Sequence, residues 1–446
     1  MRDLTKGNEA RQILLFSLPM LLGNVFQQLY NMVDSVVVGN YVGKRVLAAV
    51  GQSFPVLFVS LALVIGFGMA SNVLIAQNRG ARNNDRIRLI IDTTVIVMTA
   101  FAGVVTLLGV LLAPFILSLI GTPADVLPDA TLYLRIIFAG SLPLFGYNGV
   151  SAIQRGLGDS KTPLYALMVS TLVNIVLDVV FVVIFHWGVA GVGVATVIAQ
   201  TVSLVWTLRY LGKQSPELRI KIRGIRADRE ILREIVRIGL PSGIQQALVG
   251  AGMMALTSVV NRFGSNASAA YAAAGKLDSF AVMPAINISM AISTFTGQNL
   301  GAGRRDRVSR GLLSGLAMAL AITVTISLIL YFFGDVCVGL FTRDAEVVRI
   351  GFEYLRIVSL AYFIQTAMFS VLGVIRGAGE ALVPMANTLL AMWVVRIPLA
   401  FFLAPRMGTA GIWWSIDAGF LVGATASILY YLFGPWGRRD LTGKRA

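Results

Sequence analysis

Long apolar segments separated by short polar loops dominate this sequence and restrict it to a membrane protein. Hydrophobic residues make up 56% of the 446, charged residues 13%, and the mean hydropathy is +0.77, whereas soluble domains carry about 25% charged residues. A bilayer core is crossed by roughly 20 mostly apolar residues in a helix, or by roughly 10 alternating residues in a barrel strand. About twelve segments have helical length: 13–38, 47–75, 90–117, 131–153, 163–186, 188–211, 234–260, 269–296, 310–333, 352–374, 384–404 and 408–433. The expected fold is an all-α membrane protein with about twelve transmembrane helices.

The net charge of +15 comes from basic residues that crowd alternate loops. The clusters lie at 79–88, 213–237, 304–310 and 438–445, on the side of the membrane that both termini share. Cytoplasmic loops carry an excess of Lys and Arg, so this asymmetry predicts that both termini are cytoplasmic. The charge is therefore a topology signal and not a nucleic-acid footprint, and the expected location is the cell membrane.

The sequence contains no pattern that indicates a cofactor or a catalytic centre. Cys337 is the single cysteine, and no Cys/His cluster has the spacing of metal ligands. The Gly-rich loops near residues 80 and 301 lack the Lys-Ser/Thr that follows a phosphate-binding loop. A membrane-embedded enzyme would need a convergent nucleophile and base or a metal cluster. We therefore expect no cofactor and no enzymatic centre.

The two halves of the chain repeat. "YLRI" occurs at 133–136 and at 354–357, an offset of 354 − 133 = 221. The same offset relates Gln77-Asn78 to Gln298-Asn299, Arg155-Gly156 to Arg376-Gly377, and Pro163 to Pro384. Each half holds about six helices, so the repeats have parallel topology about an axis along the membrane normal, as in many secondary transporters. We expect an N-terminal bundle over 1–212, a charged cytoplasmic linker over 213–233 and a C-terminal bundle over 234–446, with a V-shaped cleft between the bundles.

Two carboxylates inside the apolar segments belong to the first half alone. Adding 221 to Asn174 and Asp178 gives Val395 and Leu399, and the counterpart of Asp34 is also apolar. A charge at the bilayer midplane costs at least about 2.5–3.5 kcal/mol, so such residues neutralise, pair or line a functional cavity. A scaffold role would predict polar residues in both halves. The asymmetry favours a functional site in the first half.

Helical periodicity gathers the polar residues of the first half into two stripes. Asn174 and Asp178 are four residues apart and share one face, and Thr171 extends it. In the first helix a similar stripe is formed by Gln27, Tyr30, Asn31 and Asp34. If the two faces meet, they form an oxygen-rich pocket with two carboxylates. Burial and a second carboxylate both favour the protonated form of a carboxyl group, so the pocket can hold and release a proton or a small cation.

Four longer motifs in the sequence are distinctive. They are "LPMLLGNVFQQLYNMVDSVVVGNYVG" at 18–43, "RGLGDSKTP" at 155–163, "NIVLD" at 174–178 and "STFTGQNLGAGRRDR" at 293–307. Through these motifs the chain resembles the multidrug and toxic compound extrusion (MATE) exporters over nearly its full length. The resemblance implies a secondary antiporter that works by alternating access. It would export lipophilic cations in exchange for H⁺ or Na⁺, as a monomer.

The family's proton- or sodium-coupled branch implies roles for particular residues. It has a bendable proline in helix 1 with a carboxylate fifteen residues later, which Pro19 and Asp34 match. Its Asn–Asp pair in helix 5 and a threonine eighteen residues further on are matched by Asn174, Asp178 and Thr196. The resemblance thus assigns the coupling ion, H⁺ or Na⁺, to Asp34, Asn174, Asp178 and Thr196, with Pro19 as a hinge.

Other positions are similar to the polar residues that line the family's drug cavity. These are Gln27 and Asn148, and we add Tyr30 and Asn31 from the stripe on the first helix. The chain departs from the branch that places an acidic residue two turns after the proline of helix 7. Here Pro241 is followed by Gln245, Gln246 and Val249. A second-half cation site of that kind is therefore not expected.

Two features leave alternatives open. Lys276 and Asp278 are two residues apart and so lie on different faces of helix 8. Three roles remain open for them: a structural pairing, lining of the pore, or a part in ion coupling. A lipid-linked sugar flippase of the same superfamily would share the helical architecture. It would line its cleft with several basic residues for a diphosphate, but only Lys276 and Arg396 are clear intramembrane bases.

Overall fold

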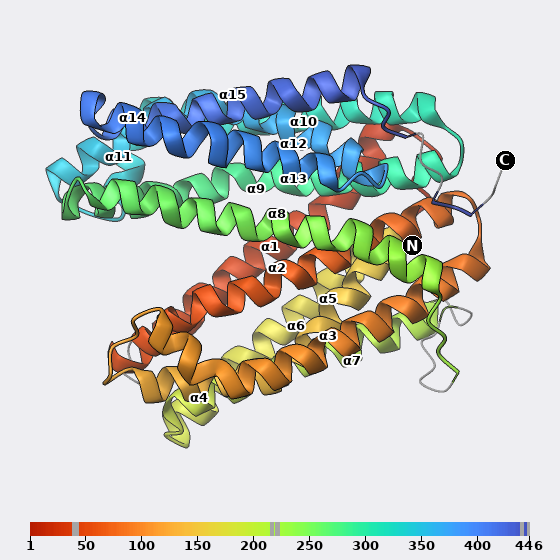
Figure 1. The fold of residues 1–446 in the computed structure, drawn as a ribbon, viewed down its shortest axis with the longest axis horizontal. Coiled ribbons are helices and arrows are strands. Elements are labelled where there is room, and N and C mark those ends of the chain that lie inside the picture. Colours follow the sequence, from red (N-terminus) through yellow and green to blue (C-terminus); the bar gives the residue numbers. More distant parts are fainter. Residues whose placement is uncertain (38–43, 215–217, 219–223, 438–440, 444–446) are drawn as a thin grey trace. The chain divides into compact units, whose positions relative to one another are not determined.

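The described part of the structure, a computed structural model, is helical throughout (Figure 1). It covers residues 1–37, 44–214, 218, 224–437 and 441–443, and for 31–37, 44, 45 and 47 the backbone alone is described. The first half holds α1 (Glu9–Val37), α2 (Lys44–Gly80), α3 (Asn84–Leu119), α4 (Leu127–Ala139), α5 (Ser141–Gly156), α6 (Lys161–Asp178), η2 (Val179–Ile184) and α7 (Gly188–Gln214). The second half holds α8 (Arg229–Asn261), α9 (Ser265–Gly301), α10 (Arg305–Gly339), α11 (Ala345–Val358), η4 (Ser359–Ala361), α12 (Tyr362–Gly377), α13 (Leu382–Thr388), η5 (Leu389–Arg396), α14 (Ile397–Met407) and α15 (Thr409–Phe433).

Each of the twelve expected segments coincides with a helix or with a series of consecutive helices. Among the described residues, eleven spans are long and apolar enough to cross a membrane, and the bent pair α4–α5 makes twelve. The prediction of about twelve transmembrane helices is confirmed.

Four segments that were expected as single helices are interrupted. The segment 131–153 contains the 50° bend between α4 and α5, and 352–374 is divided by the short 3₁₀ helix η4. The segments 163–186 and 384–404 contain the π-helical stretches η2 and η5. The pattern of apolar residues indicates which segments avoid water. It does not reveal a bend or a change from α-helix to 3₁₀ or π-helix within such a segment.

The chain divides into two compact units whose boundaries lie inside helices. Unit 1 comprises 1–2 and 19–243, and unit 2 comprises 3–18 and 244–446. The first boundary falls in α1 between Leu18 and Pro19, and the second falls in α8, two residues after Pro241. The first turns of α1 therefore belong to unit 2, and the first turns of α8 belong to unit 1. The units exchange the opening segments of their first helices.

The exchanged N-terminal segment is held to unit 2 by hydrogen bonds of its backbone and by one mostly buried ion pair. The Leu4 amide donates to Oε1 of Gln298 at 3.0 Å, and Nδ2 of Asn299 donates to the Leu4 carbonyl at 3.2 Å. Arg307 forms a salt bridge with Glu9 at 3.1 Å and donates to the Gly7 carbonyl at 2.9 Å. The segment is therefore a structural part of unit 2.

The exchanged segment of α8 is held to unit 1 by the equivalent ion pair. Arg86 lies 3.2 Å from Glu230 and 3.4 Å from Glu234. Glu9 and Arg307 are the repeat counterparts of Glu230 and Arg86, since 230 − 9 and 307 − 86 both equal 221. The sequence repeat is thus also a repeat of three-dimensional contacts.

Glycine packing repeats between the units as well. A Cβ atom on Gly156 would lie 2.8 Å from the Asn72 carbonyl oxygen, and one on Gly377 would lie 2.3 Å from that of Ser293. Both pairs differ by 221 in sequence. Each glycine lets its helix approach a neighbouring backbone more closely than any other residue would, which is how small residues act at helix contacts in membranes.

We expect Gly377→Ala to destabilise the protein strongly, because the added methyl group meets a backbone carbonyl that no rotamer change can move. Overpacking of this kind costs about 1–3 kcal/mol. The measurement is the thermal unfolding midpoint in detergent. Gly103→Ala is the matched control, because a Cβ atom there meets nothing within 4 Å; equal shifts for the two variants would contradict the packing role.

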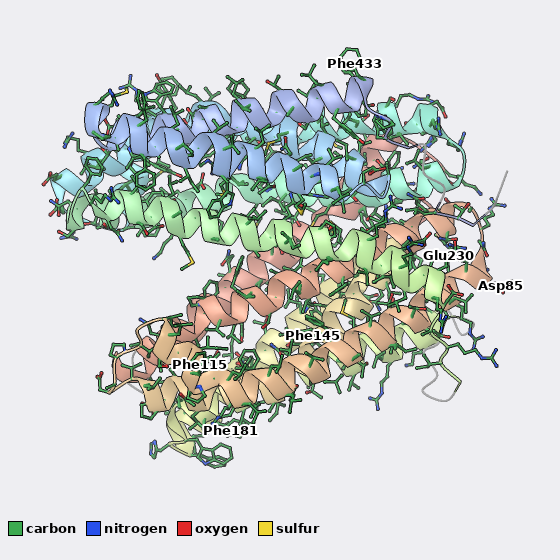
Figure 2. All side chains as sticks on the ribbon, viewed as in Figure 1. Asp85, Phe115, Phe145, Phe181, Glu230 and Phe433 are labelled. Atoms are coloured by element: carbon green, nitrogen blue, oxygen red, sulfur yellow. The ribbon has the colours of Figure 1, made fainter. Side chains whose placement is uncertain are left out.

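Large apolar side chains cover the outside of both units, as lipid contact requires (Figure 2). Phe115 of unit 1 and Phe433 of unit 2 are 63% and 81% exposed, whereas Phe145 lies buried within unit 1. Because lipid chains are as apolar as leucine, such exposure carries little cost in a bilayer.

Candidate functional site

Helix α6 carries a polar stripe into the interior of unit 1. Thr171, Asn174 and Asp178 are 7%, 1% and 1% exposed, although the helix around them is apolar. The i, i+3 and i+7 spacing places all three on one face, as the sequence predicts. Polar side chains at such a position destabilise the protein unless they pair with one another, with the backbone or with a ligand.

Several atoms of this stripe make no hydrogen bond within the described part of the chain. They are Oγ1 of Thr171 and both polar atoms of the Asn174 side chain, Oδ1 and Nδ2. A buried polar group without a partner costs about 1–3 kcal/mol. Unpaired oxygen atoms beside a buried carboxyl group are what a site for water, a proton or a small cation requires.

Hydrogen bonds set the register between α6 and α7. Ser170 donates to the Ala199 carbonyl at 2.8 Å, and Ser203 donates to the Ala166 carbonyl at 3.3 Å. In this antiparallel register Thr196 lies within one residue of the level of Asn174. The Thr196 hydroxyl donates to the Val192 carbonyl at 3.0 Å and retains lone pairs for another partner.

The α-helical hydrogen bonding changes directly after Asp178. Residues Val179–Ile184 form a π-helix, which then ends near a left-handed turn at His186. Short π-helical segments are rare and occur frequently at functional sites. The local irregularity therefore adjoins the buried carboxyl group.

The remaining candidate residues of the first half lie in α1 and α5. Gln27 and Tyr30 lie in α1 and are partly buried. Asn31 and Asp34 also lie in α1, but their side chains are outside the described residues. Asn148 in α5 is partly buried, and its Nδ2 donates to the Leu144 carbonyl at 2.8 Å.

Unit 2 contains a group of charged residues that the sequence analysis did not assemble. Arg396 of η5 is 8% exposed and lies within electrostatic range of Asp278 of α9 and of Asp417 of α15, both of which are partly buried. Lys276 is exposed instead and lies over the Phe341 ring at 5.5 Å, so it faces away from Asp278 as their spacing predicts. The missed signal was the pair of charged residues inside the apolar runs "MWVVRIPLAFF" and "IWWSIDAGFLVG".

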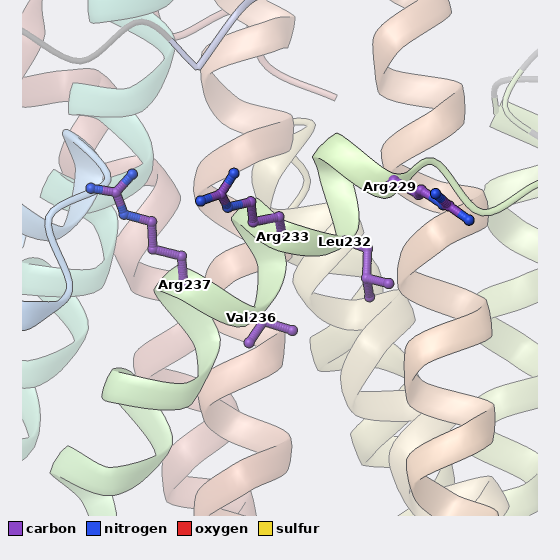
Figure 3. Close-up of a pocket in the computed structure, with 5 residues that line it drawn as sticks. All are labelled: Arg229, Leu232, Arg233, Val236 and Arg237. Atoms are coloured by element: carbon purple, nitrogen blue, oxygen red, sulfur yellow. The ribbon is translucent and has the colours of Figure 1, made fainter.

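A surface hollow of about 800 Å³ lies along the first turns of α8 (Figure 3). Its lining residues are Arg229, Leu232, Arg233, Val236 and Arg237. Three of these five residues are arginines, so the hollow has a cationic lining. It is suited to the membrane interface, where arginine side chains meet headgroups and water, and not to a cationic substrate.

The family model for MatE matches the chain twice, over residues 19–180 and 241–402. The chain belongs to the MatE family. The two matches begin 241 − 19 = 222 residues apart. The family model therefore describes one half of the molecule, and this MATE transporter contains it twice. The resemblance proposed from the motifs is confirmed.

Curated relatives match the chain over almost its entire length. "Probable multidrug resistance protein YoeA" of Bacillus subtilis is 32% identical over 98% of this chain and 96% of its own. "Probable multidrug resistance protein YpnP" of the same organism is 31% identical over 97% of each chain. "Probable multidrug resistance protein NorM" of Thermotoga maritima is 27% identical over 96% and 93%.

Solved structures share the fold as well. An outward-facing multidrug resistance MATE transporter of the MOP superfamily is 25% identical, with a TM-score of 0.89 over 97% of this chain and 96% of its own. A MOP superfamily transporter of Pyrococcus furiosus, described as having a binding pocket of reverse polarity, matches with 25% identity and a TM-score of 0.90 over 96% of both chains. The chain is thus a multi-pass membrane protein of a multidrug efflux family, and the comparisons do not favour the flippase alternative.

Proposed function

We propose that this MATE protein is a secondary antiporter that exports lipophilic organic cations in exchange for H⁺ or Na⁺. The observation that carries the proposal is the buried stripe of Thr171, Asn174 and Asp178, whose amide and hydroxyl atoms are unpaired within the described chain. The coupling ion would bind there, together with Asp34 and Thr196. No other cofactor is part of the proposal.

Contacts between α1 and α6 support the participation of Asp34. A Cβ atom on Gly23 would lie 3.8 Å from side-chain atoms of both Leu164 and Leu167, so this face of α1 packs on α6. Gly23, Gln27, Tyr30 and Asp34 follow one another at intervals of three or four residues and share that face.

On α6 the same periodicity leads from Leu164 and Leu167 to Thr171, Asn174 and Asp178. The two helices are separated by an even number of crossings and run parallel through the membrane. Continuing along both faces from the Gly23 contact therefore brings the stripe on α1 opposite the stripe on α6. Gln27, Tyr30, Asn31 and Asn148 would contribute to the substrate cavity beside this pocket.

The unit boundary at Pro19 supports a hinge in α1. Proline lacks a backbone N–H, removes one helical hydrogen bond and weakens the helix at that point. The segment before Pro19 belongs to unit 2 and the segment from Pro19 onward to unit 1. A change in the relative orientation of the units would therefore bend α1 at this residue.

The proposed cycle is alternating access. A lipophilic cation enters from the cytoplasm, and an ion from outside then binds at Asp34 and Asp178, removes their mutual repulsion and lets α1 approach α6. The cavity shrinks and the substrate leaves. One charge that moves down 100 mV supplies about 2.3 kcal/mol, enough for a modest substrate gradient.

The direct test uses purified protein in liposomes with a cationic dye and an imposed ion gradient. An imposed proton gradient, or an imposed sodium gradient, should drive dye movement. The gradient that gives the faster dye movement would identify the coupling ion. Dye movement that neither gradient alters would refute antiport. Movement of a lipid-linked sugar instead would favour the flippase.

The orientation of the protein is a separate prediction. The region 213–230 is rich in Lys and Arg, and the excess of such residues in cytoplasmic loops predicts that it faces the cytoplasm with both termini. Protease should therefore cut there in inside-out vesicles and not in intact cells. The control is a tag in the opposite loop near residue 264, which should show the reverse pattern.

A further inference from the structure

The first turns of α8 have one face packed into the protein and one face exposed. Ile231, Ile235 and Ile238 are 1%, 0% and 2% exposed and form the packed face. The opposite face carries the exposed side chains that line the hollow of Figure 3: Arg229, Leu232, Arg233, Val236 and Arg237. Ligand sites commonly measure about 300–1,000 Å³, so a hollow of about 800 Å³ has room for a small ligand or a lipid headgroup.

The acidic residues of the same turns do not neutralise the arginines of the hollow. Glu230 and Glu234 pair with Arg86 instead, at 3.2 Å and 3.4 Å. Within the described ranges, none of the three arginines of the hollow forms a salt bridge. The hollow therefore presents three positive charges that are available to an anion from outside the chain.

Neither helix stability nor the internal repeat explains these arginines. The N-terminus of a helix carries a partial positive charge, so a cation at the first residue, as at Arg229, is unfavourable there. The repeat counterparts of the three arginines, 221 residues earlier, are Asn8, Gln12 and Phe16, and none of them is charged. The arginines are therefore specific to this segment and do not belong to the scaffold that the two halves share.

The side chains of the hollow separate charge from apolar surface. Figure 3 shows Arg233 and Arg237 extending from α8 in the same direction, whereas Leu232 and Val236 point to the other side. The i, i+4 spacing makes the two arginines neighbours on the helix surface, and guanidinium groups bind phosphate oxygens through parallel N–H donors. Leu232 and Val236 are 38% and 41% exposed, and Leu240 follows one turn later at 43%. A pair of phosphate-binding groups next to an aliphatic surface matches the head and tail of a phospholipid.

The position of the hollow favours a lipid over a soluble anion. Helix α8 is long and apolar enough to cross a membrane and begins at Arg229, so its first turns lie at the membrane interface. The basic segment 213–237 predicts the cytoplasmic side, where the leaflet carries anionic lipids.

We propose that Arg233 and Arg237 bind the phosphate of an anionic phospholipid of this leaflet, and that its acyl chains lie along Leu232, Val236 and Leu240. The site is separate from the ion pocket proposed on α6 and does not depend on antiport. Arg229 lines the same hollow and points away from the other two arginines in Figure 3, so it adds to the positive potential without sharing the phosphate.

The test measures lipid binding to the full-length protein in detergent, by titration followed with native mass spectrometry. The anionic probe is phosphatidylglycerol, and phosphatidylcholine is the zwitterionic comparison. Each arginine near a membrane surface strengthens binding to anionic lipid by about fivefold, so Arg233→Gln/Arg237→Gln should weaken phosphatidylglycerol binding by about 30-fold. Phosphatidylcholine binding should stay unchanged, and the thermal midpoint establishes that the variant is folded.

Arg11→Gln is the matched control, because Arg11 is an exposed arginine in the first turn of α1, the repeat counterpart of α8. It should bind phosphatidylglycerol as the wild type does. Equal losses in the two variants would indicate a general effect of surface charge and refute the site, as would undiminished binding by the double variant. Displacement of the lipid by an equal concentration of inorganic phosphate would identify a soluble-anion site and overturn the lipid assignment. No transport is measured, so failure here and failure of the antiport proposal can be told apart.

Discussion

Asp178→Asn is expected to abolish ion-driven export while the protein remains folded and inserted. Asparagine keeps the shape and volume of aspartate but cannot exchange a proton or neutralise a cation. Asp178 is 1% exposed and adjoins the unpaired side chain of Asn174. Dye efflux from liposomes with an imposed ion gradient should therefore fall to the level of protein-free liposomes.

The matched control for this experiment is Asp335→Asn, which removes the same charge from an exposed position of α10. Its efflux should equal that of the wild type. Size-exclusion profiles and thermal midpoints of both variants establish that they are folded. Full efflux by a normally expressed Asp178→Asn protein would show that the coupling ion binds elsewhere.

The sequence predicted the helices well because lipid imposes a simple rule. Every backbone polar group must be satisfied inside the bilayer, so a long apolar segment has little choice but a helix. The repeat was also visible, since motifs such as "YLRI" survive at a constant offset. The interruptions at Gly140 and in η2 and η5 were not predicted, because they depend on packing against neighbouring helices.

The candidate site was only partly predictable. The stripe on α6 follows from the i, i+4 spacing of Asn174 and Asp178 alone. Arg396 lies within electrostatic range of Asp278 and of Asp417, which belong to two other helices, and no local spacing encodes such an arrangement. A rule that every charge inside an apolar run needs a partner would have pointed to Arg396 and Asp417 together.

The exchange of helix ends between the units was likewise not encoded in a local pattern. The linker 213–233 separates the repeats in sequence, whereas the compact units divide within α1 and α8. Glu9 and Glu230 look like ordinary first-turn acidic residues, which favour a helix N-terminus. Their contacts with Arg307 and Arg86 give them the further function of holding each exchanged segment in place.

Arg307→Ala should destabilise the protein more than its repeat counterpart Arg86→Ala. The side chains of Arg307 and Glu9 are 8% and 15% exposed, and Arg307 also donates to Asn299 and to the Gly7 carbonyl. Its removal leaves the mostly buried Glu9 carboxylate with Arg310, at 3.9 Å, as its cation and leaves two acceptors without this donor. We expect a cost of about 3 kcal/mol, at the lower end of the range for a broken buried ion pair, and a fall of several °C in the thermal midpoint.

Arg86 offers a matched comparison at the same place in the other repeat. Its partner Glu230 is 69% exposed and regains water when the arginine is lost, whereas Glu234 is 17% exposed and loses a cation at 3.4 Å. Arg307 adds hydrogen bonds to Asn299 and to the Gly7 carbonyl, so we expect a smaller shift of the midpoint for Arg86→Ala than for Arg307→Ala. Hydrogen exchange supplies the second readout: protection at residues 3–9 should be lost in Arg307→Ala and retained in Arg86→Ala. Equal midpoint shifts with intact protection at the N-terminus would mean that backbone hydrogen bonds of the Leu4 region, and not the buried ion pair, fix this segment to unit 2.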